Sequence, residues 1–360
     1  MVMTQATPVQ NETLCVAVHD RQGLRAHLAR LESFVFRGEP MPLSRHPEWL
    51  TVLEEGLGHA PYCLEAVEAG ETRGILPLSY VKSLTFGRFL VSLPYLNYGG
   101  VLARDGRVAE RLIDGAVELA RQLGVRYLEL RHERPTEHPA LGQRMCSKVH
   151  MRLPLPETAG ALWDRLSPKV RNQVRKGQKS GLAVAWGGLE LLPEFYDVLS
   201  HNMRDLGTPV FGRRLFRCIL ERFGGRAELC VTRAGHRAVA AALLLHGPGI
   251  SEIPTAGSLR DYRITNSNML MYWCALERAT QRGQGVFDFG RSSLDSNTYR
   301  FKKQWGAIPH GAEWQYHLRT GSATDLRPEN AKYQVMIRIW KNLPVGLTRL
   351  IGPPIVRGIP

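Results

Sequence analysis

The segment that decides the fold reads AELCVTRAGHRAVAAALLLH at 227–246, SEIPTAGS at 251–258, NMLMYWCALERATQRGQG at 268–285 and VFDFGR at 286–291. Its first piece has two apolar runs around Gly235, a pattern that predicts a hairpin of two strands. A strand carrying Pro and Gly follows, then a helix with apolar residues on one face, then a last strand. This order predicts one mixed unit of strands and helices.

The same order of elements occurs earlier in the chain, which predicts an internal duplication. The earlier copy consists of HPEWLTVLEEGLG at 46–58, YCLEAVEAGETRGILPLSYV at 62–81, LPYLNYGG at 93–100, AERLIDGAVELARQLG at 109–124 and VRYLELR at 125–131. The helix at 46–58 that begins the earlier copy corresponds to FGRRLFRCILERFG at 211–224 in the later copy. Arg131 and Arg291 are 160 positions apart (291 − 131), and other landmarks keep similar offsets. A repeat this long is a domain rather than a solenoid unit, so we expect a site in or beside the cleft between two domains.

The predicted fold class is α+β (mixed α/β), with two tandem domains that each have a mixed, mostly antiparallel sheet flanked by helices. We predict a disordered N-terminus at 1–12, a first domain at 13–155, a second domain at 156–320 with a basic helix at 162–180, and a basic and apolar tail at 321–360. The order of elements is that of the acyl-CoA N-acyltransferase (GNAT) fold, in which a helix N-terminus after a sheet strand holds phosphate. The pattern alone also fits other α/β arrangements.

Composition points to an anionic partner. The 360 residues carry a net charge of +14, which favours nucleotides, coenzyme A, tRNA, anionic lipids or acidic polysaccharide, although an Arg-rich proteome gives the same excess. The six cysteines form no C-x-x-C pair and the twelve histidines show no metal-binding spacing, so we predict no metal. Because the sequence shows neither a signal peptide nor a long apolar run, we expect a cytoplasmic protein.

The first candidate binding motif is SPKVRNQVRKGQKSG at 167–181. Arg171, Arg175 and Lys179 stand four apart and therefore share one helix face. The motif predicts an anion-binding surface that includes Lys169, Arg171, Asn172 and Arg175. A solvated basic face of an amphipathic helix explains the same pattern.

The second candidate motif joins FDFGRS at 287–292 to YRFKKQWG at 299–306. Asp288 is either a catalytic-site carboxylate or a buried acceptor that fixes a loop. Gly290, Arg291 and Ser292 follow it at the predicted end of a strand and are candidate substrate-binding residues. Lys302 is predicted either to hold a phosphate or stabilise an oxyanion, or to be an ordinary lysine with a buried stem.

The third candidate motif surrounds Glu252, on the strand expected to line the cleft. Transfer to an amine requires a base, which a carboxylate supplies directly or through water. Arg263, Asn266 and Ser267 precede the next helix and offer donors for a pyrophosphate, although helix capping explains Ser267 as well. Further predicted lining residues from the loop of the first copy, which could instead merely turn the chain, are Tyr95 and Tyr98.

Together the motifs KVRNQVRKGQKSG, FDFGRS and YRFKKQWG, with LPVGLTRLIGPPIVRG at 343–358, resemble the FemAB-like family of tandem GNAT-fold transferases. The resemblance covers roughly residues 30–358 and looks closest to the branch associated with PEP-CTERM, exosortase and exopolysaccharide systems. It implies transfer of an acyl or aminoacyl group to an amine of a cell-envelope or exopolysaccharide precursor. The motif positions it carries over are Lys169, Arg171, Asn172, Arg175, Asp288, Gly290, Arg291 and Lys302.

The resemblance leaves the donor open between acyl-CoA and aminoacyl-tRNA, with no bound cofactor. Residues 261–268 contain no glycine, so the usual coenzyme A phosphate loop is missing, and no long coiled-coil arm is evident. Two other functions fit the sequence: a non-catalytic adaptor for an anionic glycolipid or polysaccharide, and an acetyl-CoA-dependent N-acetyltransferase. The basic tail could lie on the inner face of an anionic membrane or pack across the two domains.

Overall fold

The computed structural model describes residues 13–83, 86–319 and 331–359. Its strands are β1 (Cys15–His19), β2 (Ala60–Glu68), β3 (Glu71–Ser83), β4 (Gly87–Val91), β5 (Leu102–Ala103), β6 (Tyr127–His132), β7 (Gln143–Pro154), β8 (Leu182–Gly187), β9 (Ala227–Ala234), β10 (Arg237–His246), β11 (Ile250–Ser258), β12 (Val286–Ser293) and β13 (Ile308–Leu318). The segment 1–12, which the sequence predicts to be disordered, lies outside the described residues.

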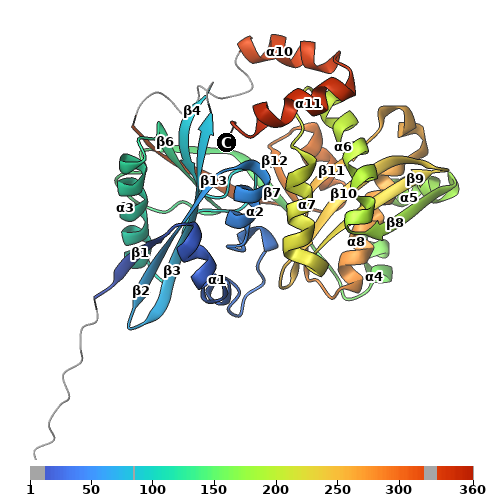
Figure 1. The fold of residues 1–360 in the computed structure, drawn as a ribbon. Coiled ribbons are helices and arrows are strands. Elements are labelled where there is room, and N and C mark those ends of the chain that lie inside the picture. The colour runs from blue at the N-terminus through green and yellow to red at the C-terminus, as the bar shows by residue number, and fades with distance from the viewer. Residues whose placement is uncertain (1–12, 84–85, 320–330, 360) are drawn as a thin grey trace, which may run out of the picture.

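Helices cover both faces of the strands (Figure 1). The α-helices are α1 (Arg21–Val35), α2 (Trp49–Leu57), α3 (Gly106–Gln122), α4 (Ala159–Arg165), α5 (Pro168–Lys179), α6 (Leu192–Leu206), α7 (Arg213–Phe223), α8 (Ser267–Gln281), α9 (Asn297–Lys303), α10 (Ala331–Lys341) and α11 (Val345–Val356). Short 3-10 helices are η1 (Leu43–Arg45), η2 (Leu189–Leu191), η3 (Gly224–Arg226) and η4 (Arg260–Thr265). Within the described residues, no helix is both long and apolar enough to cross a bilayer.

The strands form one mixed sheet in the order β1-β2-β3-β4-β6-β13-β7-β12-β11-β10-β9-β8, with β5 beside β3. The two parallel pairs are β4–β6 and β11–β12. Each half therefore supplies five consecutive strands and receives its sixth from the other half: β13 joins the first half and β7 joins the second. The predicted boundary at 155/156 does not capture this exchange, because β7 precedes it and yet pairs with β12.

The exchanged strands lie on a pseudo-two-fold axis. They pair antiparallel with each other, and His150 stands opposite His310. These two residues are 160 positions apart (310 − 150), which is the separation of Arg131 and Arg291. The axis of a two-fold rotation that exchanges positions 160 apart must pass between these two residues. The duplication predicted from the sequence is therefore present in the sheet.

The predicted helix at 162–180 is two helices instead. α4 ends at Arg165, and α5 begins at Pro168. A proline lacks the N–H that an uninterrupted helix needs, but it fits the first turn of a new one. Ser167 caps that turn because its hydroxyl accepts from the backbone N–H of Val170.

Apolar packing joins the two halves on one face of the sheet. A single cluster there combines residues of α1 and α2 with residues of α6 and α7, among them Leu31, Trp49, Phe195 and Phe216. Gly56 lets α2 approach α7 closely, because a Cβ at that position would lie 3.0 Å from the Leu215 Cα. The opposite face is covered by α3 in the first half and by α4, α5 and α8 in the second.

The inner face of the tail packs across both halves. Arg349 of α11 donates to Asp197 of α6 at 2.5 Å, and the Arg357 carbonyl accepts from the Tyr95 hydroxyl at 2.6 Å. Thr348 is fully buried. The first part of the predicted tail, 321–330, lies outside the described residues.

Candidate active site

The parallel strands β11 and β12 separate after three paired positions. They pair only from Ile250–Val286 to Glu252–Asp288. Beyond that point β11 carries Pro254, which has no N–H to donate to a neighbouring strand. Its pairing with β12 stops, and β11 continues to pair with β10 alone. The sheet therefore opens between two strands directly beyond Glu252 and Asp288.

A bulge in β12 shapes the other side of the opening. The register of β12 against β7 shifts between Asp288 and Arg291, which bends the strand. Gly290 adopts a φ of 75°, and a Cβ there would lie 2.9 Å from the Asn97 side chain. Glycine is thus required twice at this point of the FDFGRS motif, for its backbone angle and for its contact with the loop at 92–101.

The chain leaves the opening along β11, passes through η4 and then reaches the first turn of α8. Asn266 precedes it in a left-handed conformation and makes no side-chain capping bond, while Ser267 is buried. The N–H groups of such an uncapped helix start are available to an anion. Arg263 is exposed in the preceding 3-10 helix.

The basic helix α5 lies against this turn. Gly177 permits the approach, since a Cβ there would stand 3.2 Å from the Asn266 carbonyl oxygen. Arg175 stacks over Trp163 at 5.4 Å, and Asn172 is exposed. Against the residues that the structure describes, no α5 cation forms an ion pair; these cations are Lys169, Arg171, Arg175, Lys176 and Lys179.

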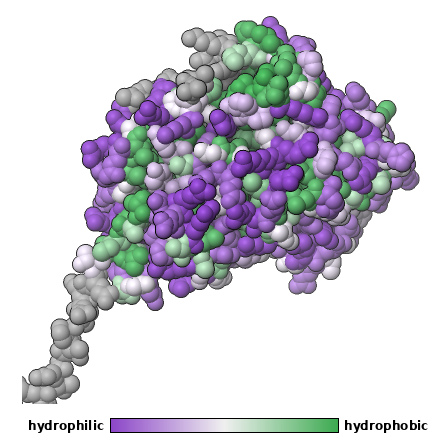
Figure 2. All heavy atoms as spheres, viewed as in Figure 1, coloured by the Kyte–Doolittle hydropathy of each residue, from purple (hydrophilic) through white to green (hydrophobic). Residues whose placement is uncertain are grey.

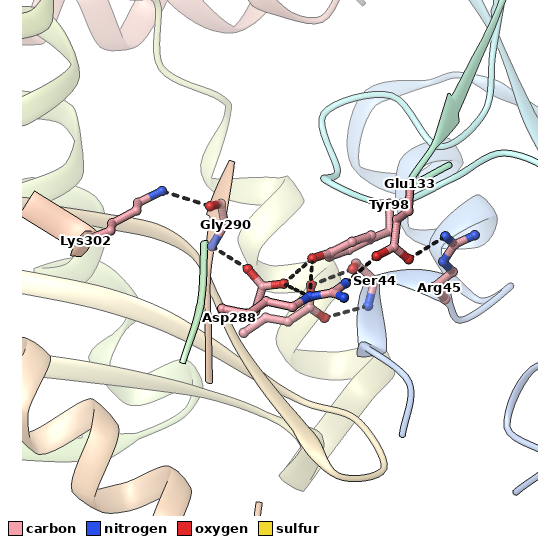
Figure 3. Close-up of polar contacts among 9 residues, drawn as sticks. Ser44, Arg45, Tyr98, Glu133, Asp288, Gly290 and Lys302 are labelled. Atoms are coloured by element: carbon pink, nitrogen blue, oxygen red, sulfur yellow. Dashed lines mark hydrogen bonds and ion pairs between the residues drawn. The ribbon is translucent and has the colours of Figure 1, made fainter. Parts of the chain in front are cut away.

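Asp288 is the centre of a buried polar network (Figure 3). Its carboxylate is fully buried and accepts from the Tyr98 hydroxyl, from the Gly290 N–H at 2.7 Å and from the Arg152 Nε at 3.2 Å. Burial and the neighbouring Asp288 charge raise the pKa of Tyr98 well above its usual range. Three donors compensate the buried charge, as a buried carboxylate requires.

Two arginines connect this network to the surface. Arg152 donates from Nη2 to Glu133 at 2.6 Å. Arg45 donates to Glu133 at 2.9 Å and to the Gly99 carbonyl at 2.7 Å. The Glu133 side chain is 28% exposed, so the network runs from solvent inward to Asp288. Strands and loops from both halves are thereby held together.

Glu252 is closed off from the opening that its strand borders. Its carboxyl accepts from the Ser44 N–H at 2.9 Å and the Ser44 hydroxyl at 2.5 Å, and it is 1% exposed. The sequence placed Glu252 on a cleft wall, but η1 covers it. Burial, followed by the nearby Asp288 charge, raises its pKa to about 8, so it is mostly protonated at neutral pH.

Lys302 supports the bulge of β12. Its ammonium donates to the carbonyls of Gly290 and Arg291 at 3.0 and 2.9 Å. Burial lowers its pKa to about 8, although Asp288 acts in the opposite direction. The Lys302 ammonium is thus bound by backbone carbonyls. The sequence predicted instead that it binds a phosphate or oxyanion, or that it is an ordinary lysine with a buried stem.

Arg291 is a cation with no acidic partner among the described residues. Its guanidinium lies 4.0 Å from the ring centre of Trp314, and Arg131 lies 4.1 Å from the same ring. Arg131 has its own carboxylate, Glu129, at 2.6 Å. Arg291 has none; it is partly exposed, and burial with the Arg131 charge lowers its pKa to about 10. This arginine is therefore ready to receive an anion.

His150 adds two polar atoms without partners to the same face. It stands opposite Arg291 in the sheet and stacks on Tyr98 with ring centres 4.3 Å apart. It is fully buried, neither ring nitrogen has a hydrogen-bond partner in the described structure, and burial lowers its pKa to about 3. Buried polar atoms without partners commonly mark a place for water or ligand.

The structure separates some residues that the sequence grouped. Tyr98 enters the Asp288 network, whereas Tyr95 bonds to the C-terminal segment. Ser292 alternates with Arg291 along β12 and so points to the other face of the sheet. Residues of the site that sequence reasoning missed are Ser44, Arg45, Glu133, His150, Arg152 and Trp314.

A cavity of about 410 Å³ lies elsewhere in the second half, between Trp186, Glu228, Arg278 and Arg282. Its charges satisfy one another, since Glu228 pairs with both arginines and with His246. The opening beyond Glu252 and Asp288 is therefore the candidate site.

Comparisons with known proteins concern the fold. A family model described as an acetyltransferase (GNAT) domain matches residues 166–303, which include α5, β11, α8 and β12. No curated protein matches the sequence. Solved structures show similarity of fold over most of the chain.

FemX is 14% identical, with a TM-score of 0.63, over 86% of this chain and 97% of that chain. L-PGS from Bacillus licheniformis is 13% identical, with a TM-score of 0.52, over 90% of this chain and 96% of its own. A tandem GNAT protein from the clavulanic acid biosynthesis pathway is 12% identical, with a TM-score of 0.52, over 85% and 99%. At these identities the likeness concerns the fold. The chain therefore has the fold of two tandem GNAT-like domains, and its match to the GNAT acetyltransferase domain lies in the second half.

Proposed function

We propose that this protein is an N-acyltransferase that moves an acyl or aminoacyl group onto an amine of a cell-envelope or exopolysaccharide precursor. The observation that carries the proposal is the opening between β11 and β12, followed by the uncapped start of α8, within the segment that matches an acetyltransferase domain. The FemX and L-PGS likenesses support the fold of such an enzyme.

The donor would enter at the opening. The edge of β11 beyond Glu252 has no partner strand on the β12 side, and such an edge can bond an extended chain. Donor phosphates would lie at the first turn of α8, near Arg263, Asn266 and Ser267, with the α5 cations beside them. Both acyl-CoA and aminoacyl-tRNA carry the phosphates that this arrangement suits.

Proton transfer is assigned to Glu252. An amine attacks only after it loses a proton, and a base works best with a pKa near the working pH. The pKa of about 8 for Glu252 meets that requirement, and opening of the Ser44 contact would expose it. Asp288 is proposed to orient the network, and Lys302 to hold the bulge in place.

The acceptor's anionic group is assigned to Arg291, the partly exposed cation on Trp314. Replacing Arg291 by alanine is expected to lower kcat/KM about 10- to 100-fold, the range for one lost charge-assisted hydrogen bond. Transfer of a radiolabelled acyl or aminoacyl group to amine acceptors measures this. Arg111→Ala, an exposed arginine of α3, is the matched control. Equal kcat/KM for Arg291→Ala and wild type would refute the assignment.

The α5 cations give a second test, which also separates the two donors. The variant Lys169→Ala/Arg171→Ala/Arg175→Ala is expected to raise the donor KM about tenfold and to flatten its salt dependence, because fewer phosphate contacts remain. Arg37→Ala/Arg111→Ala, which removes two exposed arginines of the first half, should change neither the donor KM nor its salt dependence. A steep salt dependence of the wild-type KM identifies tRNA as the donor, and a shallow one identifies coenzyme A. An unchanged donor KM in the triple variant would contradict the donor site.

A second candidate function is a non-catalytic adaptor for an anionic glycolipid or polysaccharide. It is favoured by the closed state of Glu252 and by the backbone contacts that occupy Lys302. The adaptor hypothesis predicts ligand binding that is lost in Arg291→Ala, with no transfer from any donor by the wild type. The transferase hypothesis predicts the same loss of binding in Arg291→Ala, together with transfer from a donor by the wild type.

A further inference from the structure

The two helices of the tail have faces of opposite character. The inner face packs on the protein: Ile337 lies against Gly207, where a Cβ would be 2.5 Å from the Ile337 Cγ2, and Trp340 and Thr348 are buried. Gly352 fits beside Val210 and Trp340. These contacts fix α10 and α11 on the body of the molecule.

The outer face is apolar and exposed. Its side chains are between 42% and 73% exposed: Val335, Met336, Ile339, Leu347 and Leu350. Met336 and Ile339, like Leu347 and Leu350, stand three apart and so share a face of their helix. They are five of the eleven large exposed hydrophobic residues that the described structure contains. Figure 2 shows the apolar surface at the top edge, over α10 and α11.

The same segment has only positive charges. Residues 331–359 contain five lysines and arginines and no aspartate or glutamate. Arg338 and Lys341 are exposed and form no ion pair with a described residue. An exposed apolar face flanked by lysine and arginine is the pattern of a helix that lies in a membrane interface.

Physical arguments favour a lipid surface over other occupants. A contiguous apolar patch on a soluble protein marks an interaction site. A two-fold dimer through this face would place Arg338 and Lys341 of one copy near the same cations of the other, at an electrostatic cost. An anionic bilayer instead offers hydrocarbon to the apolar side chains and negative head groups to the cations. Figure 1 shows the helix pair at the edge of the molecule, where a flat surface can reach it.

We propose that the outer face of α10 and α11 docks the protein onto anionic lipid bilayers. The inference does not depend on the proposed transferase activity. It has a consequence for the site, because the Arg357 carbonyl at the end of α11 bonds Tyr95 in the loop that supplies Tyr98. A docked bilayer would thus be connected to the candidate site through one loop.

Flotation with lipid vesicles tests the proposal. The full chain is mixed with vesicles of phosphatidylglycerol and phosphatidylcholine, and separately with vesicles of phosphatidylcholine alone. We expect it to float with the anionic vesicles and less so at high salt. The variant Met336→Ser/Ile339→Ser/Leu350→Ser should lower the partition coefficient about tenfold or more, because three exposed apolar side chains are lost. Arg338→Gln/Lys341→Gln should remove most of the salt dependence.

The matched control is Val18→Ser/Leu189→Ser, which removes two exposed apolar residues far from the tail and should float like wild type. Wild type that stays at the bottom with anionic vesicles, or a triple variant that floats equally well, would overturn the proposal. So would a change from dimer to monomer in the triple variant during size-exclusion chromatography, which would assign this face to a second copy. Because the readout is binding, failure here leaves the transferase hypothesis standing.

Discussion

Asp288→Ala is expected to destabilise the folded chain by about 2–5 kcal/mol, the cost of leaving two buried donors without their acceptor. Arg152 keeps Glu133 as a second partner. Arg152 would lose the carboxylate that its Nε contacts at 3.2 Å, and the buried Tyr98 hydroxyl would lose its acceptor. The bulge would also lose the bond from the Gly290 N–H. Urea denaturation monitored by circular dichroism measures the change.

The control for this prediction is Asp164→Ala, which removes an exposed aspartate of α4 and should change stability by about 0.5 kcal/mol or less. A double-mutant cycle with Arg152→Met isolates the pair, and we expect a clear coupling energy because the groups touch. An Asp288→Ala variant as stable as wild type would mean that the network does not hold the halves together.

Glu252→Gln is expected to change how stability depends on pH. The folded chain raises the pKa of this carboxyl from an ordinary 4.5 to about 8, so the folded state keeps a proton that the unfolded state releases. The stability from this group is fully present below the unfolded pKa and is lost as pH rises through the folded pKa. The loss between about pH 6 and about pH 9 amounts to about 3 kcal/mol.

Glutamine keeps the shape and cannot titrate, so the comparison with wild type isolates this carboxyl. The stability of wild type relative to Glu252→Gln should fall by that amount as pH rises over this range, in denaturation curves measured in matched buffers. A parallel pH dependence of the two proteins would show that Glu252 titrates as an ordinary carboxyl. The proposed role as base would then lose its physical support.

The fold was predictable from sequence in its local elements and in its duplication. Helical spacing and turn residues mark each hairpin and helix; Ala69 and Gly70, for example, both have positive φ angles, as a tight hairpin turn requires. The exchange of β7 and β13 was missed, because pairing between strands more than about 130 positions apart leaves no local pattern. α6 and α9 carry helical patterns that were not singled out.

The site was half predictable for a related reason. Short motifs around two strands contain Asp288, Glu252, Gly290, Arg291 and Lys302. The structure places them near the point where β11 and β12 separate, although Ser44 closes Glu252 off. Their partners come from separate elements, each supplying a residue that is unremarkable in its own segment. These partners are Ser44, Arg45, Tyr98, Glu133 and Arg152, of which sequence reasoning proposed Tyr98 alone. Only the fold shows that Ser44 closes Glu252, and that in the described part of the chain Arg131 has an acidic partner while Arg291 has none.

The duplication creates one opening between parallel strands in each half, and we assign the donor to the opening in the second half. In the first half, Leu93 and Leu96 of the loop after β4 are buried, and the Arg131 N–H and guanidinium bond Ser92 and the Leu96 carbonyl. That loop fills the space beside β6. In the second half, a short connection through η4 leads from β11 to α8.

Hydrogen–deuterium exchange with and without donor tests this assignment most directly. The chain would be measured alone, with a coenzyme A thioester and with an aminoacyl-tRNA. We expect one of these donors to slow exchange in the outer part of β11, in the first turn of α8 and at the β12 bulge. The effect should be weaker in the triple variant of α5. Protection confined to the loop at 92–101 and the start of α3, or no protection by either donor, would contradict it.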